Sequence, residues 1–407
     1  MEENKKRTFI IDFGCCLTFG HNLRVVDLYR SVEAQRGQST KAIICKRARK
    51  IKVENKEQYD FILPTVYFNL IIDTAKNKYF RYWLKFVILF QLVIMFCGIN
   101  LFELQTRFAI KKLFKKYRFS EHDIIIFPSA DYYGVKSLLK RLIKIDVGKR
   151  PRVHLRFIGV FENAHSYYKD NFMELIHLIN KTSGTLSVSA EVPVYAKYIN
   201  TLLPQINVAS EPYPILSNEY KSRVITNCVK RPFTIVLPGT NRSDKGYADV
   251  FYLAKEILFE FPFIRFIVQD MKEWDKHYNK KYRDKLCGLV NVTLLNAILS
   301  KEEIETLYSK ADLILCPYCK NVYHYRGSGI HYEAIQQRIP VLVKKGVGFE
   351  EEVINWSSGW LYETKQDLFL CLKQIMDLDS GTIRKKMDHA FLKLKQRSNA
   401  AYNSHLS

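Results

Sequence analysis

A short segment near residue 330 has residue types and spacing suited to binding a phosphate. It has the sequence YRGSGIHYEA over residues 325–334 and lies between two apolar runs, a layout typical of strand, glycine-bearing loop, helix and strand. A pair such as Ser328 and Gly329 at the start of a helix presents free backbone N–H groups and the positive end of the helix dipole. Glu333 follows about one helical turn later, within reach of hydroxyls attached to the same phosphate. A site that holds both a diphosphate and a ribose is a nucleotide-sugar site.

A second loop carries the positive charge that a diphosphate needs. It has the sequence LPGTNRSDKG over residues 237–246 and lies between an apolar run and an amphipathic stretch, Tyr247 to Glu260. Arg242 and Lys245 are three residues apart in it, and two cations so close together can neutralise a diphosphate leaving group. The alternative is a solvated basic loop without a ligand.

Apolar, β-branched runs recur along the chain with helical stretches between them, which predicts parallel sheets built from βαβ units. Seven strands are expected in the first half, at Thr8–Phe13, Lys41–Cys45, Phe61–Val66, Asp123–Pro128, Val153–Gly159, Thr185–Ala190 and Ile206–Ala209. Six are expected in the second half, at Phe233–Pro238, Ile264–Gln269, Val292–Leu295, Leu313–Pro317, Pro340–Val343 and Trp360–Tyr362.

The 407 residues suffice for two such domains. Prolines and charges cluster between residues 211 and 232, where we place the boundary. The expected division is an acceptor-binding domain at 1–215, a donor-binding domain at 216–382, and a tail at 383–407 that crosses back to the first domain. Doubly wound sheets bind ligands at the carboxyl ends of their strands, so both domains are expected to face a central cleft.

The second half resembles the donor domain of retaining glycosyltransferases of family 4, the group 1 glycosyltransferases, which have the α/β fold called GT-B. The motifs that carry the resemblance lie between residues 233 and 345 and comprise Gly239, Arg242, Lys245-Gly246, Val292–Leu295, Glu302–Ile304, Ala311–Leu313, Pro317, Ser328-Gly329, Glu333-Ala334 and Pro340-Val341. The resemblance implies an enzyme that transfers a sugar from a nucleotide donor to a glycan or lipid-linked glycan.

The resemblance also implies roles for individual residues. Arg242 and Lys245 hold the donor diphosphate and act in catalysis, Gly239, Ser328 and Gly329 contact it through the backbone, and Glu333 binds the ribose. The turn Ala297–Leu299 frames the base, with Leu299 in contact with the donor, which can be UDP- or GDP-linked. No cofactor and no metal are expected, since no His/Cys/carboxylate cluster is evident and the two cations stabilise the departing diphosphate.

One position departs from the family. Relatives commonly carry a second carboxylate eight residues before this glutamate, where this chain has Tyr325. The departure affects how the donor sugar is positioned rather than how the nucleotide is bound. It favours the alternative of a non-catalytic membrane- or polyanion-binding protein with a degenerate nucleotide-sugar site.

The first half offers weaker candidates for the other side of the cleft. Gly14 and Gly20 follow the first strand, where glycines let the backbone approach phosphates, or where they form only a turn. Glu162 and His165, after the strand near residue 157, are candidate catalytic or sugar-binding residues, with surface residues as the alternative. Arg156 and Glu191 are further candidates at strand ends.

The net charge of +22 is unevenly distributed, with 17 Lys/Arg against 5 Asp/Glu between Lys76 and Arg152. Such a field attracts polyanions, an anionic membrane surface or nucleic acid; simple solubility is the alternative. Nucleic acid is disfavoured because no recognition motif accompanies the basic run at Lys111–Arg118.

An apolar segment, Phe86–Ile99, falls short of the roughly 20 residues that span a bilayer. It is either a buried core helix or a helix at the membrane interface. Nine scattered cysteines and a polar start without a signal peptide predict a cytoplasmic protein, either free or peripheral at the inner face of the plasma membrane.

Overall fold

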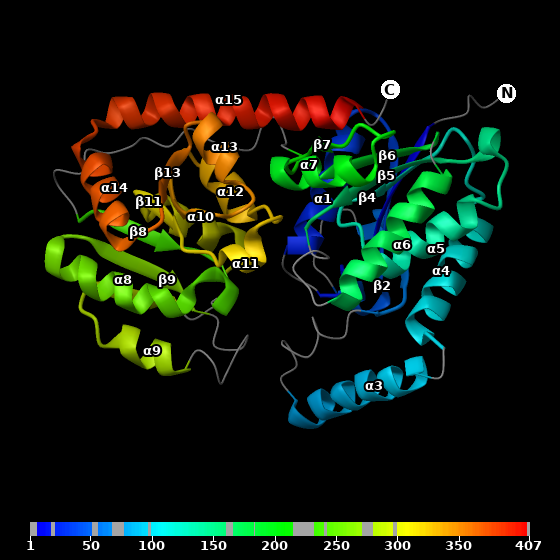
Figure 1. The fold of residues 1–407 in the computed structure, drawn as a ribbon, viewed down its shortest axis with the longest axis horizontal. Coiled ribbons are helices and arrows are strands. Elements are labelled where there is room, and N and C mark those ends of the chain that lie inside the picture. Colours follow the sequence, from blue (N-terminus) through cyan, green and yellow to red (C-terminus); the bar gives the residue numbers. More distant parts are fainter. Residues whose placement is uncertain are drawn as a thin grey trace. The chain divides into compact units, whose positions relative to one another are not determined.

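The fold is described from a computed structural model of the chain (Figure 1). The structure describes residues 6–404 except 18–20, 51–55, 67–76, 97–98, 160–165, 183, 215–231, 240–241, 271–279 and 296–298. The chain divides into two compact units. Unit 1 comprises Met1–Glu191, Tyr195–Leu216 and Asn399–Ser407, and unit 2 comprises Val192–Val194 and Ser217–Ser398.

Unit 1 is built on a seven-stranded sheet in the order β3-β2-β1-β4-β5-β6-β7. Every neighbouring pair is parallel, as βαβ connections require. The chain moves outward from β1 in one direction and returns to β4 before moving the other way, so the sheet switches direction between β1 and β4. The strands are β1 Arg7–Asp12, β2 Ser39–Cys45, β3 Tyr59–Leu63, β4 Ile124–Phe127, β5 Arg152–Phe157, β6 Leu186–Ala190 and β7 Ala209–Ser210.

Helices α4, α5 and α6 lie side by side in unit 1 (Figure 1), and the first two begin at well-formed caps. Asn100 accepts a hydrogen bond from the Glu103 amide, and Asp131 accepts one from the Gly134 amide. The α-helices of this unit are α1 His21–Gln35, α3 Lys78–Phe96, α4 Leu101–Tyr117, α5 Tyr132–Leu142, α6 Ser166–Thr182 and α7 Pro193–Leu202.

Unit 2 contains a six-stranded parallel sheet in the order β10-β9-β8-β11-β12-β13, which switches direction between β8 and β11. Side chains on one face of this sheet, such as Ile235 and its cross-strand neighbour Phe266, pack with apolar residues of α8, α9 and α14 into one core. The strands are β8 Thr234–Leu237, β9 Arg265–Gln269, β10 Val292–Leu295, β11 Leu313–Cys316, β12 Val341–Lys344 and β13 Gly359–Tyr362.

The helices of unit 2 connect these strands, and two of them start at capping boxes, Ser300 with Glu303 and Thr364 with Asp367. The helices are α8 Tyr247–Glu260, α9 Lys280–Cys287, α10 Lys301–Lys310, α11 Lys320–Tyr323, α12 Gly329–Gln336, α13 Glu350–Asn355, α14 Lys365–Asp377 and α15 Ser380–Ser404, the last of which ends among residues grouped with unit 1.

The prediction of doubly wound parallel sheets is confirmed, and each of the thirteen expected strands has a counterpart. The largest differences are at the edges of the first sheet. There β3 begins at Tyr59 rather than Phe61, and only Ala209 of the expected strand 206–209 is paired. Edge strands have a single neighbour to define their ends, so their bounds depend least on the local apolar pattern.

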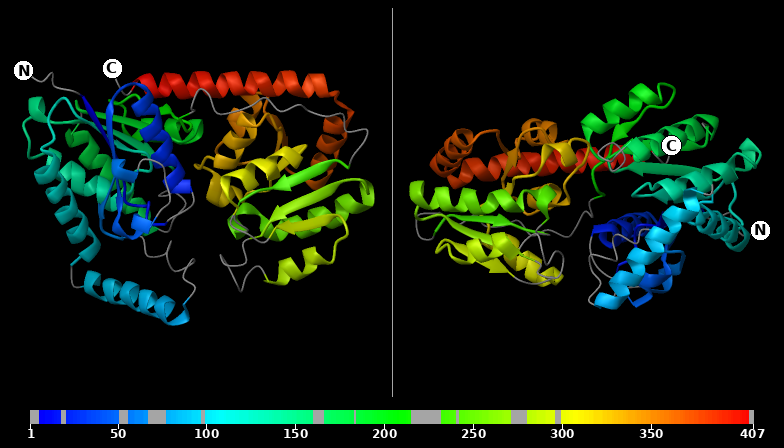
Figure 2. Two further views of the ribbon diagram at one scale, coloured as in Figure 1. Left: turned by 180° about the vertical axis from the view of Figure 1, so that it is seen from behind. Right: turned by 60° about the horizontal axis from the view of Figure 1, so that its bottom comes forward.

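The alternative of a buried core helix for the apolar segment is wrong. In Figure 1 and in the view from behind (Figure 2, left), α3 lies at the periphery of unit 1, apart from its sheet. Phe86 is 63% exposed and Leu89 is 60% exposed. No helix in the described part of the chain is long and apolar enough to cross a membrane.

Candidate functional site

The candidate site lies at the carboxyl ends of β8 and β11 in unit 2. These strands are neighbours at the point where the sheet switches direction, and crevices at such points hold ligands in doubly wound folds. The loop after β8 contains Gly239, Arg242 and Lys245, and the segment after β11 leads through α11 to the start of α12. The two loops predicted to bind phosphate therefore start from adjacent strands.

Gly246 allows the two loops to pack closely against each other. Its φ of 72° lies in the left-handed region, and a β-carbon there would stand 2.0 Å from the Pro317 carbonyl oxygen, so only glycine fits. The backbone N–H of Cys319 also donates to the Asp244 carbonyl oxygen at 2.9 Å. The conformation of the β8 loop is therefore fixed by the chain that follows β11.

Lys245 reaches back toward the first turn of its own loop. Its Nζ lies 3.1 Å from the position of a β-carbon on Gly239, and the Ile330 Cδ1 lies 3.0 Å from that same position. Lys245 and Gly239 are among the residues that line a small pocket, with Leu237, Pro238, Tyr247, Val250, Val268, Gln269, Leu315, Pro317 and Tyr318. The ammonium group, the glycine turn and the first turn of α12 thus converge.

The surroundings of Lys245 weaken its hold on a proton. Burial, followed by the nearby positive charge of Arg242, lowers its pKa to about 8. Among the described residues no carboxylate lies within 4 Å of its Nζ, so within that part of the chain this charge is not paired. An enclosed ammonium of this kind is suited to an incoming anion.

Arg242 is held more tightly than Lys245. Its Nε donates to the Asp244 Oδ1 at 2.8 Å, its Nη2 pairs with the Asp244 Oδ2, and the same Nη2 donates to the Tyr323 hydroxyl at 3.1 Å. This arrangement orients the guanidinium. It also means that Asp244 partly neutralises the positive charge to which a diphosphate would bind.

The start of α12 has the form expected of a phosphate-binding helix terminus. Ser328 is the N-cap, and its hydroxyl oxygen accepts a hydrogen bond from the His331 N–H at 3.3 Å. The same hydroxyl lies 3.3 Å from the Tyr318 hydroxyl. The first hydrogen bond within α12 is donated by the Tyr332 N–H to the Ser328 carbonyl oxygen, so the amides of Gly329 and Ile330 are not used by the helix itself.

Glu333 is oriented by a tyrosine from α10. Its Oε2 accepts a hydrogen bond from the buried Tyr308 hydroxyl at 2.8 Å, and its side chain is half-buried one turn into α12. Its negative charge also favours the protonated form of Lys245. The carboxylate, the ammonium and the first turn of α12 therefore lie in one electrostatic neighbourhood.

Comparison with known proteins identifies the family of this part of the chain. Residues 218–389 match the sequence profile of the family described as glycosyl transferases group 1. Residues 218–389 are a group 1 glycosyltransferase domain. The expectation that the chain is a glycosyl-transferring enzyme is thereby confirmed. A search of curated protein sequences finds no match to the chain.

Solved structures show that the glycosyltransferase domain is part of a GT-B fold. The sucrose-phosphate synthase of Thermosynechococcus elongatus has a TM-score of 0.65 at 12% identity, over 96% of this chain and 94% of that one. Anabaena HepE, solved with UDP and glucose, has a TM-score of 0.62 at 13% identity, over 98% and 99%. WaaG, described as a glycosyltransferase of lipopolysaccharide biosynthesis, has a TM-score of 0.54 at 11% identity, over 97% and 98%.

The glycosyltransferase domain brings together most of the residues predicted for donor binding. Gly239 and Lys245 line the pocket, and Ile330 of the first turn of α12 lies beside Gly239. Arg242 and Glu333 are close enough to affect the pKa of Lys245. Leu299 is half-buried directly before the N-cap of α10, whereas Ala297 and Ile298 lie outside the described residues.

Three candidates of the first half, Gly20, Glu162 and His165, also lie outside the described residues. Arg156 is described, and its proposed ligand role is wrong. Its guanidinium is completely buried in unit 1 and donates to the carbonyl oxygens of Pro128 and Glu211, both at 3.0 Å, and to the Glu191 carboxylate at 3.2 Å. A buried charge bound on three sides is a structural element, and Glu191 is part of it.

Three residues of the glycosyltransferase domain were not predicted. Gln269 accepts a hydrogen bond from the Gly239 N–H at 2.6 Å, Asp244 pairs with Arg242, and Tyr318 lies with its ring centroid 5.8 Å from the Lys245 Nζ. The signal for Asp244 was present in the sequence, two residues after an arginine. Gln269 ends β9 and Tyr318 follows β11, so only the sheet order places them near the loop.

Proposed function

We propose that the protein transfers a sugar from a nucleoside diphosphate sugar to a hydroxyl of a glycan or lipid-linked glycan. The observation that carries this proposal is the position of the Lys245 ammonium, beside Gly239 and the first turn of α12. A cation beside the first turn of a helix suits the charge that develops on a departing diphosphate.

The roles of the remaining residues follow from their contacts. Arg242 adds positive charge and keeps its orientation through Asp244 and Tyr323, while Glu333, held by Tyr308, binds ribose hydroxyls. The amides of Gly329 and Ile330 contact the diphosphate. Positive charge from Arg242 and Lys245 lets the transfer proceed without a metal ion, and retention of the anomeric configuration is proposed from the family resemblance alone.

The test is transfer or hydrolysis of labelled nucleotide sugars by the purified chain, screened over UDP- and GDP-linked donors. Lys245→Ala should lower turnover by about ten- to a hundredfold, because a charge-assisted bond is worth roughly 1.5–3 kcal/mol. Turnover of Lys245→Ala at the wild-type rate would refute the assignment of this lysine.

A separate assay tests whether turnover requires a metal ion. Turnover should be unchanged in excess EDTA. A complete loss that added Mg²⁺ or Mn²⁺ restores would show that a metal ion, rather than Arg242 and Lys245, stabilises the leaving group.

A further inference from the structure

The outward face of α3 is apolar, which is unusual for a helix at the surface of a globular protein. Among the described residues, eight of the 21 large apolar side chains classed as exposed belong to this one helix, with exposed fractions from 48% to 82%. They are Tyr79, Tyr82, Trp83, Phe86, Leu89, Phe90, Leu92 and Val93. Contiguous exposed apolar surface of this extent marks a binding surface.

One side of α3 exposes large apolar residues that an ordinary surface helix would bury. Tyr79, Tyr82, Phe86, Leu89 and Val93 recur at intervals of three and four residues, so they form one stripe along the exposed side. Gln91, by contrast, is 3% exposed, and within the described part of the chain neither end of its amide makes a hydrogen bond. Burying an amide while exposing five large apolar groups is unfavourable in water.

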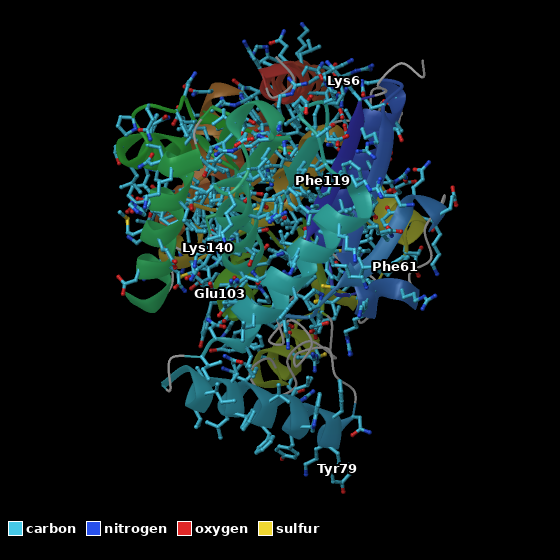
Figure 3. All side chains as sticks on the ribbon, turned by 90° about the vertical axis from the view of Figure 1, so that its right-hand side faces the viewer. Lys6, Phe61, Tyr79, Glu103, Phe119 and Lys140 are labelled. Atoms are coloured by element: carbon cyan, nitrogen blue, oxygen red, sulfur yellow. The ribbon has the colours of Figure 1, made fainter. Side chains whose placement is uncertain are left out.

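Figure 3 shows α3 at the edge of unit 1, with Tyr79 at one end and many side chains directed away from the rest of the unit. The apolar surface continues onto the start of α4, where Leu104 is 37% and Phe108 is 69% exposed. Further along α4, Lys111, Lys112 and Lys115 are exposed. The exposed side of α4 therefore changes from apolar near α3 to basic away from it.

The charge beside the apolar stripe is of one sign. From Thr74 to Phe102 the sequence contains Lys76, Lys78, Arg81 and Lys85 but no Asp or Glu. Lys78 and Lys85 are exposed, and the Lys78 Nζ lies 5.7 Å from the centroid of the Tyr82 ring. Tyrosine and tryptophan next to lysines are typical of helices that lie at the level of lipid headgroups.

We propose that α3 and the exposed side of α4 form a docking surface for an anionic lipid bilayer. In this arrangement the stripe from Tyr79 to Val93 enters the boundary between headgroups and acyl chains, and Lys78, Lys85 and the three lysines of α4 contact anionic headgroups. A second copy of the chain would bring the same cations together, so charge complementarity favours the bilayer.

The experiment is co-sedimentation of the full chain with vesicles of phosphatidylcholine alone and of phosphatidylcholine with phosphatidylglycerol. The wild type should bind the anionic vesicles, and high salt should release it. Phe86→Ser with Leu89→Ser should lower binding by about tenfold or more, because each buried CH₂ contributes to partitioning. Lys111→Gln, Lys112→Gln and Lys115→Gln together should lower binding to anionic vesicles by about ten- to a hundredfold. Lys116 is left unchanged because it pairs with Asp60.

Matched controls are available in unit 2. Phe259→Ser removes an aromatic ring that is 84% exposed, and the triple variant Lys373→Gln, Lys385→Gln and Lys393→Gln removes the same charge from exposed positions. Both should bind like the wild type. Equal loss in the controls, equal binding to both vesicle types, or no binding to either would overturn the proposal.

An apolar-face variant that abolishes self-association instead of vesicle binding would equally overturn it and identify a second copy as the partner. The far-UV circular dichroism spectrum and the melting temperature, unchanged in every variant, report folding. The vesicle assay contains no nucleotide sugar, so its outcome is independent of the proposed transferase chemistry.

Discussion

Lys245 and Gly239 face each other across the loop after β8, with the lysine Nζ 3.1 Å from where a β-carbon on the glycine would stand. The glycine also has a φ of 94°, which L-residues rarely adopt. The space for the ammonium therefore depends on the absence of a side chain six residues earlier, which explains why both residues belong to one functional loop.

Gly239→Ala should weaken binding of a nucleoside diphosphate by roughly tenfold, because the new methyl group displaces Lys245 and strains the turn. Titration calorimetry with the bare diphosphate measures this. Gly288→Ala is a suitable control, since its nearest neighbour to a new β-carbon is a carbonyl oxygen at 3.5 Å. Wild-type affinity in Gly239→Ala would show that the contact has no role in binding.

Binding of the diphosphate should depend on pH through Lys245. Its pKa of about 8 in the unbound protein means that it is half-neutral near that pH. An anion that binds beside it favours the charged form, so affinity should fall as the pH rises through 8 and binding should take up protons. Calorimetry in two buffers of different ionisation enthalpy measures the uptake. Lys245→Arg should lose this uptake near pH 8, and an unchanged uptake would place the titrating group elsewhere.

Glu333→Ala should weaken binding of the nucleoside diphosphate by about ten- to a hundredfold, the loss of one or two charge-assisted hydrogen bonds to ribose. Tyr308→Phe, which removes the hydroxyl that orients this carboxylate at 2.8 Å, should have a smaller effect in the same direction. Inorganic pyrophosphate lacks the ribose, so its binding distinguishes a role of Glu333 at the ribose from a role at the phosphates. This binding should be nearly unaffected in both variants, and a parallel loss would mean that Glu333 acts on the phosphate end.

Asp12 should make the stability of unit 1 depend on pH. It is completely buried at the end of β1, and burial, then the negative charge of Asp131, raises its pKa to about 8. The unfolded chain releases this proton near pH 4 and the folded chain only near pH 8, so stability should decline across that interval as the pH rises. Asp12→Asn should remove a decline on the order of 3 kcal/mol.

Chemical denaturation at pH 5 and pH 8.5 measures this difference. Asp377→Asn, at an exposed position of α14, is the control and should leave the decline unchanged. A decline of equal size in Asp12→Asn would assign it to another group.

The local pattern of apolar and polar residues was enough to predict the strands and the phosphate-binding loops of unit 2. Apolar β-branched runs predict β8 and β11, and the residues that follow them, Arg242, Lys245, Ser328 and Gly329, are recognisable because phosphate binding demands short-range features of the chain. The order of the motifs was enough to predict the family and the GT-B fold.

Tertiary structure decided what each side chain does. Arg156 lies within a strand and Lys245 follows one, and both are cations. Arg156 is enclosed by Pro128, Glu191 and Glu211, whereas Lys245 faces a pocket. The environment of a charge depends on which strands become neighbours, and residues such as Gln269 arrive from elsewhere in the chain.

The same holds for α3. Its apolar composition is equally suited to a core and to a membrane interface, and only the packing of the rest of unit 1, which covers Leu84 and Gln91 and leaves Phe86 exposed, distinguishes them. Hydrophobicity is a property of the sequence, whereas burial is a property of the fold, because it depends on which other residues are close enough to exclude water.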